Sequence, residues 1–344
     1  MLRMLAAMEL PSYRKFLRPL LFALDPEAVH HMAMGSLRFG GRALRAMAPK
    51  QDPRLARTVF GITFPNPVGL AAGFDKNAVA LPAWEGLGFG FVEAGTVTAR
   101  GQPGNPKPRI FRVPEYTALI NRLGFNNDGA DAVSARLQRL KDSGQWPRIP
   151  VGINIGKSKV TPIEEATADY LLSFQRLQHF GDYFVLNVSS PNTPGLRALQ
   201  DRAALDELLT HIQGHNTTGK PVLVKIAPDL DWAAIEEILS LAEEHAIAGL
   251  IATNTTIDQG ALPAQFRRQG GLSGKPLRER STEIVRFIAE RSQIPIIAVG
   301  GIMSADDALE KFDAGASLVQ LYTGFIYEGP GLIRQICDAL LARQ

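Results

Sequence analysis

The sequence predicts an α/β fold, a (β/α)8 TIM barrel that follows an N-terminal amphipathic helical extension. After Pro49, eight short apolar runs recur, and each ends in polar or glycine-rich residues. Helical patterns lie between most of these runs, which is typical of parallel strands covered by helices. Eight such units favour closure into a barrel. No G-x-G-x-x-G pattern follows the first run, which argues against a dinucleotide-binding open sheet.

Residues 1–49 are expected to be helical and to form a unit separate from the barrel, which takes residues 50–344. Apolar residues recur here at helical spacing: Tyr13, Phe16, Leu17, Leu20, Leu21 and Leu24. Asp25, Pro26 and Glu27 then supply an N-cap, a proline at the first helical position and an acid in the first turn. The next apolar face continues until Gly40 and Gly41. We interpret the segment as an amphipathic hairpin on a membrane, with helices docked on the barrel core as the alternative.

Basic residues are concentrated at the beginning of the chain. Residues 1–57 contain ten Lys or Arg and four Asp or Glu, a net charge of +6, whereas the whole chain carries +3. This excess favours an anionic membrane surface. Nucleic acid is not expected, because no basic run with stacking aromatics or known motif occurs. No apolar run reaches the roughly 20 residues that span a bilayer, and Arg3 and Glu9 interrupt any signal-peptide core. The chain is therefore expected to stay in the cytoplasm.

The eight predicted strands can be placed by number, and so can the features between them. They cover residues 68–73, 89–95, 150–155, 183–188, 222–226, 249–253, 294–299 and 318–321. Residues 96–149 form an insertion, in which 109–113 is a candidate antiparallel strand. Residues 161–164 have the pattern of a capping box. Ser304 begins another helix, which is expected to end near Gly315.

The most concentrated polar stretch covers residues 187–195, Asn-Val-Ser-Ser-Pro-Asn-Thr-Pro-Gly. Its prolines stiffen the loop, and loops at the carboxyl ends of barrel strands form active sites. Ser190 is a candidate catalytic residue here, and a polar turn is the alternative. No histidine near Ser190 indicates a hydrolase triad, and no carboxylate pair indicates a glycosidase. A serine that is correctly held can still relay a proton.

Glycines and lysines predict an anionic ligand at the same end of the barrel. Residues 270–274, 300–301 and 322–324 are glycine-rich and predict a phosphate site. Lys225 interrupts an apolar strand and is expected to face the barrel mouth, where a flavin would be a suitable partner. Lys157 is expected to be a solvated surface charge.

Seven asparagines offer donors and acceptors that match a pyrimidine imide: Asn121, Asn126, Asn127, Asn154, Asn187, Asn192 and Asn254. The single cysteine and the absence of an H-E-x-x-H motif argue against a metal site.

Five motifs together resemble the dihydroorotate dehydrogenase family. They cover residues 64–76 (FPNPVGLAAGFDK), 121–127 (NRLGFNN), 187–195 (NVSSPNTPG), 225–229 (KIAPD) and 252–256 (ATNTT). Serine at position 190, where other branches carry cysteine, and the N-terminal helices resemble the quinone-dependent branch. Ser158 stands where asparagine is expected in that branch.

The resemblance implies an FMN-dependent oxidation of dihydroorotate to orotate in pyrimidine biosynthesis, with a membrane quinone as electron acceptor and no partner protein. It implies a peripheral protein on the cytoplasmic face of the bacterial cell membrane. Two alternatives stay open: a soluble dihydroorotate dehydrogenase with another acceptor, and a flavin-free phosphate-binding barrel attached to a membrane.

Site residues follow from the same resemblance. Ser190 would be the general base, with Thr193 and Phe125 shaping a proton relay, and His30, Arg112 and Tyr322 would line a quinone tunnel. FMN would contact Ala72, Gly73, Phe74, Asp75, Lys76, Thr96, Asn154, Asn187, Lys225, Thr253, Gly274, Gly301, Tyr322 and Thr323. Dihydroorotate would contact Lys76, Asn121, Arg122, Leu123, Gly124, Phe125, Asn187, Asn192, Asn254 and Thr255.

Overall fold

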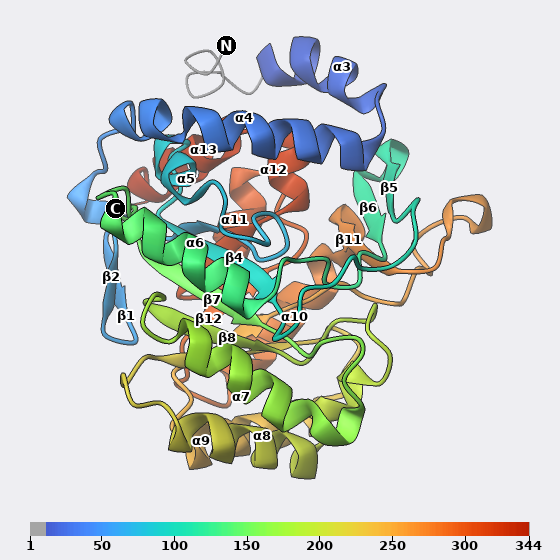
Figure 1. The fold of residues 1–344 in the computed structure, drawn as a ribbon. Helices are drawn as coiled ribbons and strands as arrows, with labels where there is room; N and C mark the ends of the chain where they lie inside the picture. The colour runs from blue at the N-terminus through green and yellow to red at the C-terminus, as the bar shows by residue number, and fades with distance from the viewer. Residues whose placement is uncertain (1–11, 344) are drawn as a thin grey trace.

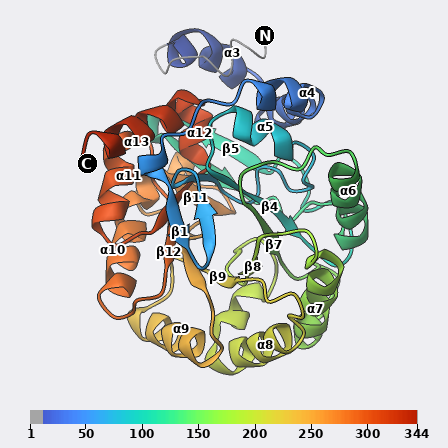
Figure 2. The same cartoon turned by 90° about the vertical axis from the view of Figure 1, so that its left-hand side faces the viewer.

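The computed structural model describes residues 12–343, and its centre is a closed barrel of eight parallel strands (Figures 1 and 2). The strands are β3 Val68–Leu70, β4 Phe91–Val97, β7 Val151–Ile155, β8 Tyr183–Asn187, β9 Val222–Ile226, β10 Gly249–Ala252, β12 Ile296–Val299 and β13 Leu318–Leu321. They follow one another around the barrel in chain order, and β13 pairs with β3 to close it. Each of the eight predicted apolar runs is a barrel strand, so the predicted fold class is confirmed.

Helices surround this barrel, as the view along its axis shows (Figure 2). They are α5 Leu81–Gly86, α6 Ala130–Asp142, α7 Ala166–Leu177, α8 Arg202–Gly214, α9 Trp232–Glu244, α10 Arg278–Ala289, α11 Ala305–Asp313, α12 Thr323–Glu328 and α13 Gly331–Leu341. Short 3-10 turns are η2 Pro53–Leu55, η3 Pro114–Tyr116, η4 Ile163–Glu165, η5 Leu196–Gln200, η6 Ala264–Phe266 and η7 Lys275–Leu277.

Of the two helix starts predicted within the barrel, one is confirmed. The Ser304 side chain accepts the Asp307 backbone N–H and caps α11. Thr161 caps nothing, because its hydroxyl donates to Asp169 Oδ1 at 2.7 Å. The capping box predicted at residues 161–164 is therefore wrong.

Large aromatic rings fill the inside of the barrel at its amino end. Phe91 and Tyr183 are fully buried there, and two strand glycines make room for them. A Cβ on Gly69 would lie 2.3 Å from the Phe91 ring, and one on Gly152 would lie 2.1 Å from Tyr183. The hairpin of β1 (Arg57–Val59) and β2 (Ile62–Phe64) covers this end (Figure 2). Because the amino end is packed solid, any cavity has to open at the carboxyl end.

The N-terminal extension lies across helices of the barrel (Figure 1). It consists of the π-helix η1 Tyr13–Leu17, α3 Arg18–Phe22 and α4 Pro26–Ala46; residues 1–11 of the predicted segment lie outside the described part. Asp25 accepts the Ala28 N–H at 2.8 Å and begins α4 as predicted. The helix does not stop at Gly40 and Gly41, because both are buried and Gly41 packs on α5.

The insertion between β4 and β7 brings a second sheet to the carboxyl end of the barrel. Its strands β5 Ile110–Val113 and β6 Ala118–Asn121 pair antiparallel, and β11 Gly271–Gly274 pairs with β6. The predicted strand at 109–113 is confirmed. Arg109, just before β5, forms a buried ion pair with Glu27 of α4, with Nη2 and Oε1 2.7 Å apart. The insertion therefore fixes the helical extension to the barrel.

Candidate active site

A cavity of about 130 Å³ opens at the carboxyl ends of the barrel strands. It gathers most of the predicted site residues: Ala72, Gly73, Lys76, Thr96, Asn121, Leu123, Gly124, Phe125, Asn187, Ser190, Asn192, Lys225, Thr253, Asn254, Thr255, Gly274, Gly301, Tyr322 and Thr323. These residues come from stretches of the chain that lie far apart in sequence. The barrel brings them together because the carboxyl ends of parallel strands meet at one face.

Of the residues predicted to contact FMN or dihydroorotate, four do not line this cavity. Asp75 is fully buried, and its carboxylate accepts N–H groups of Val79, Ala80 and Trp84 at 2.8 to 3.1 Å. It therefore holds the loop after β3 and offers no oxygen to a ligand. The Phe74 ring packs on His30 instead, with centroids 5.3 Å apart.

Asn154 and Arg122 also lie outside the cavity lining. The Asn154 amide hydrogen-bonds to Thr96, at 2.6 Å, and to Glu93, at 2.8 Å. Asn154 thus holds the side chain of Thr96, which does line the cavity. The Arg122 guanidinium turns away and donates to the Pro108 carbonyl at 2.9 and 3.1 Å.

A layer of polar side chains separates the cavity from the aromatic interior. Glu93 is the centre of this layer, and its carboxylate accepts hydrogen bonds from Asn154 at 2.8 Å and Gln320 at 2.6 Å. Gln320 also lines the cavity, and its Oε1 has no hydrogen-bond partner within residues 12–343. The sequence interpretation missed Glu93 and Gln320, although a polar residue inside an otherwise apolar strand is the same signal that identified Lys225.

Two lysines, the buried Lys225 and the half-buried Lys76, face the cavity without an acidic partner at hydrogen-bonding distance. Neither Lys225 nor Lys76 forms an ion pair or a side-chain hydrogen bond in the described part of the chain. Burial lowers the pKa of Lys225, although Glu93 raises it in part. Burial and then the Arg109 cation lower the pKa of Lys76 to about 8. Buried ammonium groups need a partner, so this cavity suits an anionic or electron-rich ligand.

Lys157 is buried, with 2% of its surface exposed. Its ammonium donates to the carbonyls of Ser158 and Thr161, so the prediction of a solvated surface charge is wrong. Ser158 is also buried, and its hydroxyl donates to Asp169 at 3.0 Å while it accepts the Arg100 N–H at 3.1 Å. Both residues hold the loop after β7, and neither lines the cavity.

A continuous set of hydrogen bonds orients the amides at the cavity. Asn187 donates to Thr96 Oγ1 at 2.9 Å. Asn254 donates to Asn187 Oδ1 at 3.1 Å and to Ser189 Oγ at 2.9 Å. The set joins the ends of β4, β8 and β10. Because each amide has a defined partner, the donors and acceptors that face the cavity are fixed in advance.

Ser190 lies in this cavity, and its Oγ accepts the Asn192 backbone N–H at 3.3 Å. Thr193, three residues later, is buried, and its hydroxyl has no hydrogen-bond partner among the described residues. The geometry therefore leaves two hydroxyl groups on one loop with hydrogen-bonding capacity to spare.

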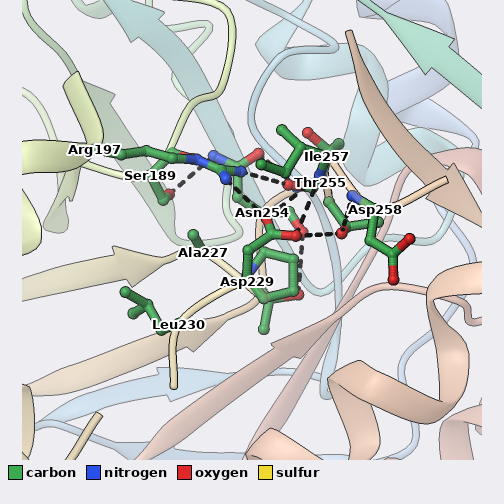
Figure 3. Close-up of polar contacts among 12 residues, drawn as sticks. Ser189, Arg197, Ala227, Asp229, Leu230, Asn254, Thr255, Ile257 and Asp258 are labelled. Carbon is green, nitrogen blue, oxygen red and sulfur yellow. Dashed lines mark hydrogen bonds and ion pairs between the residues drawn. The ribbon is translucent and has the colours of Figure 1, made fainter. Parts of the chain in front are cut away.

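An arginine and an aspartate that the sequence interpretation did not single out hold this loop (Figure 3). Arg197 donates to the carbonyl of Ser189 at 3.1 Å and to that of Thr255 at 3.0 Å, and it pairs with Asp229 at 2.8 Å. Asp229 in turn accepts the Thr256 hydroxyl. This Arg197–Asp229 clamp joins the loops after β8, β9 and β10. Asp229 is the last residue of the 225–229 motif, so the sequence did contain a signal for this aspartate.

Hydroxyls and glycines form the opposite wall. Ser273 and Thr323 share a hydrogen bond of 2.9 Å, and Gly300 and Gly301 both have positive φ angles of 121° and 76°. Glycine adopts such angles without strain and leaves the backbone N–H groups accessible. The predicted phosphate-binding segments are thus brought to one side of the cavity. Four apolar lining residues were not predicted: Ala71, Leu277, Val299 and Ile302.

A second, apolar cavity of about 410 Å³ lies between the helical extension and the barrel. Its lining includes Leu17 and Leu21 from the extension and Phe325 from α12. It shares Asn121, Leu123, Ser273 and Tyr322 with the first cavity. An apolar space therefore leads from the N-terminal helices to the wall of the polar cavity.

The three predicted tunnel residues, His30, Arg112 and Tyr322, all line the apolar cavity. Burial, and then the Lys76 cation, lower the pKa of His30 to about 3, so its ring is neutral at physiological pH. Burial raises the pKa of Tyr322 to about 12. Arg112 donates to the Leu24 carbonyl at 2.8 Å and so bridges the extension and the insertion.

Large apolar side chains are exposed on the outer face of the extension. Phe16, Leu20, Leu24 and Phe39 have between 53% and 89% of their surface accessible. The predicted stripe is thus divided, because Leu17 and Leu21 turn inward to the cavity. None of the described helices combines the length and the apolar character that crossing a bilayer requires.

The possible metal ligands of the described chain lie elsewhere. Asp206, Glu244 and His245 are close together on the outside of the barrel. Glu244 pairs with Arg202, and His245 pairs with Asp206, each at 2.7 Å. These side chains already have partners and are not part of either cavity.

Comparison with known proteins gives one consistent result. Residues 54–343 match the family model described as dihydroorotate dehydrogenase. The chain is 56% identical over 333 residues to the dihydroorotate dehydrogenase (quinone) of Gloeobacter violaceus, covering 95% of this chain and 93% of that protein. It is 53% identical to the protein of the same name from Nostoc punctiforme, covering 96% and 94%.

Solved structures agree with these sequence matches. A dihydroorotate dehydrogenase from Eimeria tenella, crystallised with ferulenol, superposes with a TM-score of 0.82 at 41% identity and covers 93% of this chain and 91% of that chain. The ligand-free structure from the same organism gives a TM-score of 0.83 at 40% identity, with 93% and 95% covered.

Proposed function

The chain belongs to the dihydroorotate dehydrogenase family, and on that premise we propose that it oxidises dihydroorotate to orotate, a step of pyrimidine biosynthesis, with a membrane quinone as electron acceptor. The observation that carries the proposal is the pair of lysines without an acidic partner, Lys76 and Lys225, in a cavity that also contains the fixed amides. These groups suit an anionic pyrimidine beside a flavin.

Enzymes of this family are flavoproteins, and we propose that the flavin here is FMN. The donor set supports this assignment. Lys225 and Gln320 offer a cation and an unpaired amide oxygen deep in the cavity, and residues 300–301 and 322–324 offer backbone to a phosphate. When bound, the flavin accepts two electrons from dihydroorotate and passes them to the quinone.

The remaining polar residues are assigned to the substrate. Lys76 is the counter-charge for its carboxylate, and Asn121, Asn187, Asn192 and Asn254 hydrogen-bond to the imide edge and the carboxylate. Ser190 Oγ takes the proton that leaves the pyrimidine ring. A neutral hydroxyl has to pass its own proton on as it does so, and the unpaired Thr193 hydroxyl is the next carrier on the same loop.

We assign the apolar cavity to the quinone and residues 1–49 to the membrane surface. A lipid-soluble acceptor needs an apolar path, and the cavity between α4 and the barrel reaches residues that also line the polar cavity. The exposed apolar side chains of the extension, flanked by Arg14, Lys15 and Arg18, fit an anionic bilayer surface. A soluble acceptor would leave this apolar cavity without a purpose.

Flavin content and anaerobic reduction test the proposal. The purified protein should carry about one flavin per chain, released on denaturation as the mononucleotide, and dihydroorotate should bleach its absorbance. Oxygen-free reoxidation should then be faster with a long-tail quinone than with fumarate or NAD⁺. Folded protein that is colourless and takes up no added FMN would contradict the assignment.

A further inference from the structure

A third cavity, of about 640 Å³, lies beside the active site and belongs to neither half of the proposed reaction. Its lining residues come from the insertion, the loop after β7, the Ser190 loop and the segment before β11: Asn105, Pro106, Arg122, Lys159, Pro191, Asn192, Pro194, Ile257, Gln259, Arg268, Gln269 and Gly270. We call it the vestibule.

The vestibule is positively charged and has no compensating acid. Arg122, Lys159 and Arg268 line it, and no aspartate or glutamate does. Within residues 12–343, none of the three forms an ion pair. Lys159 donates to Asn105 Oδ1 at 2.9 Å, Arg268 donates to backbone carbonyls, and Arg122 donates to Pro108 and Gln269. No acidic side chain that lines the vestibule offsets the charge of these three cations.

The wall between the vestibule and the polar cavity is thin. Asn192 lines both spaces, and its amide reaches Asn121 across the boundary at 3.3 Å. Asn105 donates to the carbonyls of Asn192, at 3.2 Å, and Arg122, at 3.0 Å. The boundary thus consists of Asn192 of the Ser190 loop, its weak hydrogen bond to Asn121 and the hydrogen bonds from Asn105.

We propose that the vestibule is the entry site for the anionic substrate, where Arg122, Lys159 and Arg268 concentrate dihydroorotate before it passes Asn192. The inference rests on the proposed function, because dihydroorotate carries a carboxylate. Cavities lined by one sign of charge raise the association rate of oppositely charged ligands by roughly 10 to 10³-fold, and salt suppresses the effect. Arg122, predicted to bind substrate, thereby acts at the entrance and not in the cavity itself.

Charge removal at the vestibule tests the proposal. Lys159→Gln and Arg268→Gln should each lower kcat/KM for dihydroorotate by about threefold at low ionic strength, and together by about tenfold. The maximal rate should stay unchanged, since neither residue lines the polar cavity. At about 0.5 M salt the variants and the wild type should converge, because exposed charges are screened within a few ångströms.

Two matched controls test whether the loss of charge at the vestibule, and not a substitution elsewhere or at Lys159 itself, causes the effect. Lys220→Gln removes the same charge just before β9, at the amino end of the barrel, and should leave kcat/KM unchanged. Lys159→Arg keeps the charge and should behave like the wild type.

The association rate of orotate, followed by stopped-flow absorbance, gives a readout without turnover and should fall in parallel with kcat/KM. Three results would each contradict the entry-site proposal. They are a kcat/KM of the wild type that does not depend on salt, a Lys220→Gln variant that loses as much kcat/KM as Lys159→Gln, and a fall in the maximal rate of the vestibule variants. Failure of saturating dihydroorotate to bleach the flavin would instead contradict the proposed function.

Discussion

The two cavities that meet at Tyr322 are built in opposite ways. The polar cavity lies within one barrel, and its side chains are connected by hydrogen bonds from Glu93 through Asn154 and Thr96 to Asn187. The apolar cavity lies between separate units, the N-terminal extension and the barrel. The polar cavity therefore has donors and acceptors fixed by hydrogen bonds, whereas the apolar cavity is a space between two packed surfaces.

The extension is attached to the barrel at a few polar points around the apolar cavity. Tyr13 donates to the Ile326 carbonyl at 2.7 Å, Arg14 pairs with Glu328, and Glu27 pairs with Arg109. These contacts hold the extension at its edges and leave the space between them apolar. We therefore expect substitutions in the polar cavity to change rates strongly, and substitutions around the apolar cavity to change acceptor use and stability.

The largest effect is expected in the polar cavity. Ser190→Ala should slow anaerobic flavin reduction by dihydroorotate roughly 10²–10⁴-fold, which corresponds to about 3–5 kcal/mol, because a positioned general base is lost. Flavin content and orotate affinity should be retained. Ser190→Cys should keep more activity than Ser190→Ala, since a thiol can relay the proton. Near-normal reduction in Ser190→Ala would show that Ser190 is only a turn residue.

A pH effect is expected from the apolar cavity. The folded pKa of His30, about 3, lies below its ordinary value of 6.5. The unfolded chain therefore binds more protons between these values, and the wild type loses stability as pH falls through 6.5. At pH 5 the loss is roughly 2 kcal/mol relative to pH 8. His30→Gln lacks this contribution, so urea unfolding should show a smaller pH dependence for this variant.

His31 lies 3.5 Å from Glu27 and is kept in both proteins, so the comparison of His30→Gln with the wild type isolates position 30. Equal pH dependence in His30→Gln and the wild type would mean that the cavity does not exclude the charged imidazole.

A smaller kinetic effect is expected from the Arg197–Asp229 clamp. Arg197→Gln or Asp229→Asn should lower the rate of flavin reduction about tenfold with little change in KM, because the Ser189 carbonyl loses the guanidinium that holds it. The double variant should be no worse than either single one. Arg202→Gln breaks an exposed pair on α8 and α9 and should have no effect. Additive losses would contradict a shared role.

The smallest effects are expected from the apolar residues of the N-terminal extension, and they should differ between its outer side and the side that lines the apolar cavity. Phe16→Gln with Leu20→Gln alters exposed side chains, and should weaken binding to anionic liposomes and raise KM for long-tail quinones a few-fold. Leu17→Gln with Leu21→Gln alters the cavity lining, and should raise quinone KM even in detergent while liposome binding stays. Bleaching by dihydroorotate should be unchanged in both. Loss of bleaching would make these helices structural braces.

Much of the fold followed from local pattern. The eight strands could be predicted because short, nearly continuous apolar runs such as 222–226 are typical of parallel strands that are buried on both faces. The glycine-rich segments and Asn187, Asn192 and Ser190 were identified as site residues because they end such runs. Strand β11 was missed because it pairs with β6, which is distant in sequence; β6 was also missed, although it forms a hairpin with β5.

Lys157 and Arg122 show where local pattern was insufficient. Both are basic residues in loops, yet Lys157 is buried by carbonyls of its own loop, and Arg122 turns away from the cavity that its neighbours Asn121 and Leu123 line. The direction of a long side chain depends on which acceptors lie within reach, and those come from the fold.

By itself the sequence determined the barrel, the polar loop ends and the apolar, basic extension, because hydrophobic period and residue chemistry are local properties. Tertiary structure decided which groups act together. It paired Arg197 with Asp229 and split the N-terminal stripe into an inner and an outer face. It also left Arg122, Lys159 and Arg268 unpaired around one vestibule. Such pairings depend on distances between segments far apart in the chain, which only packing fixes.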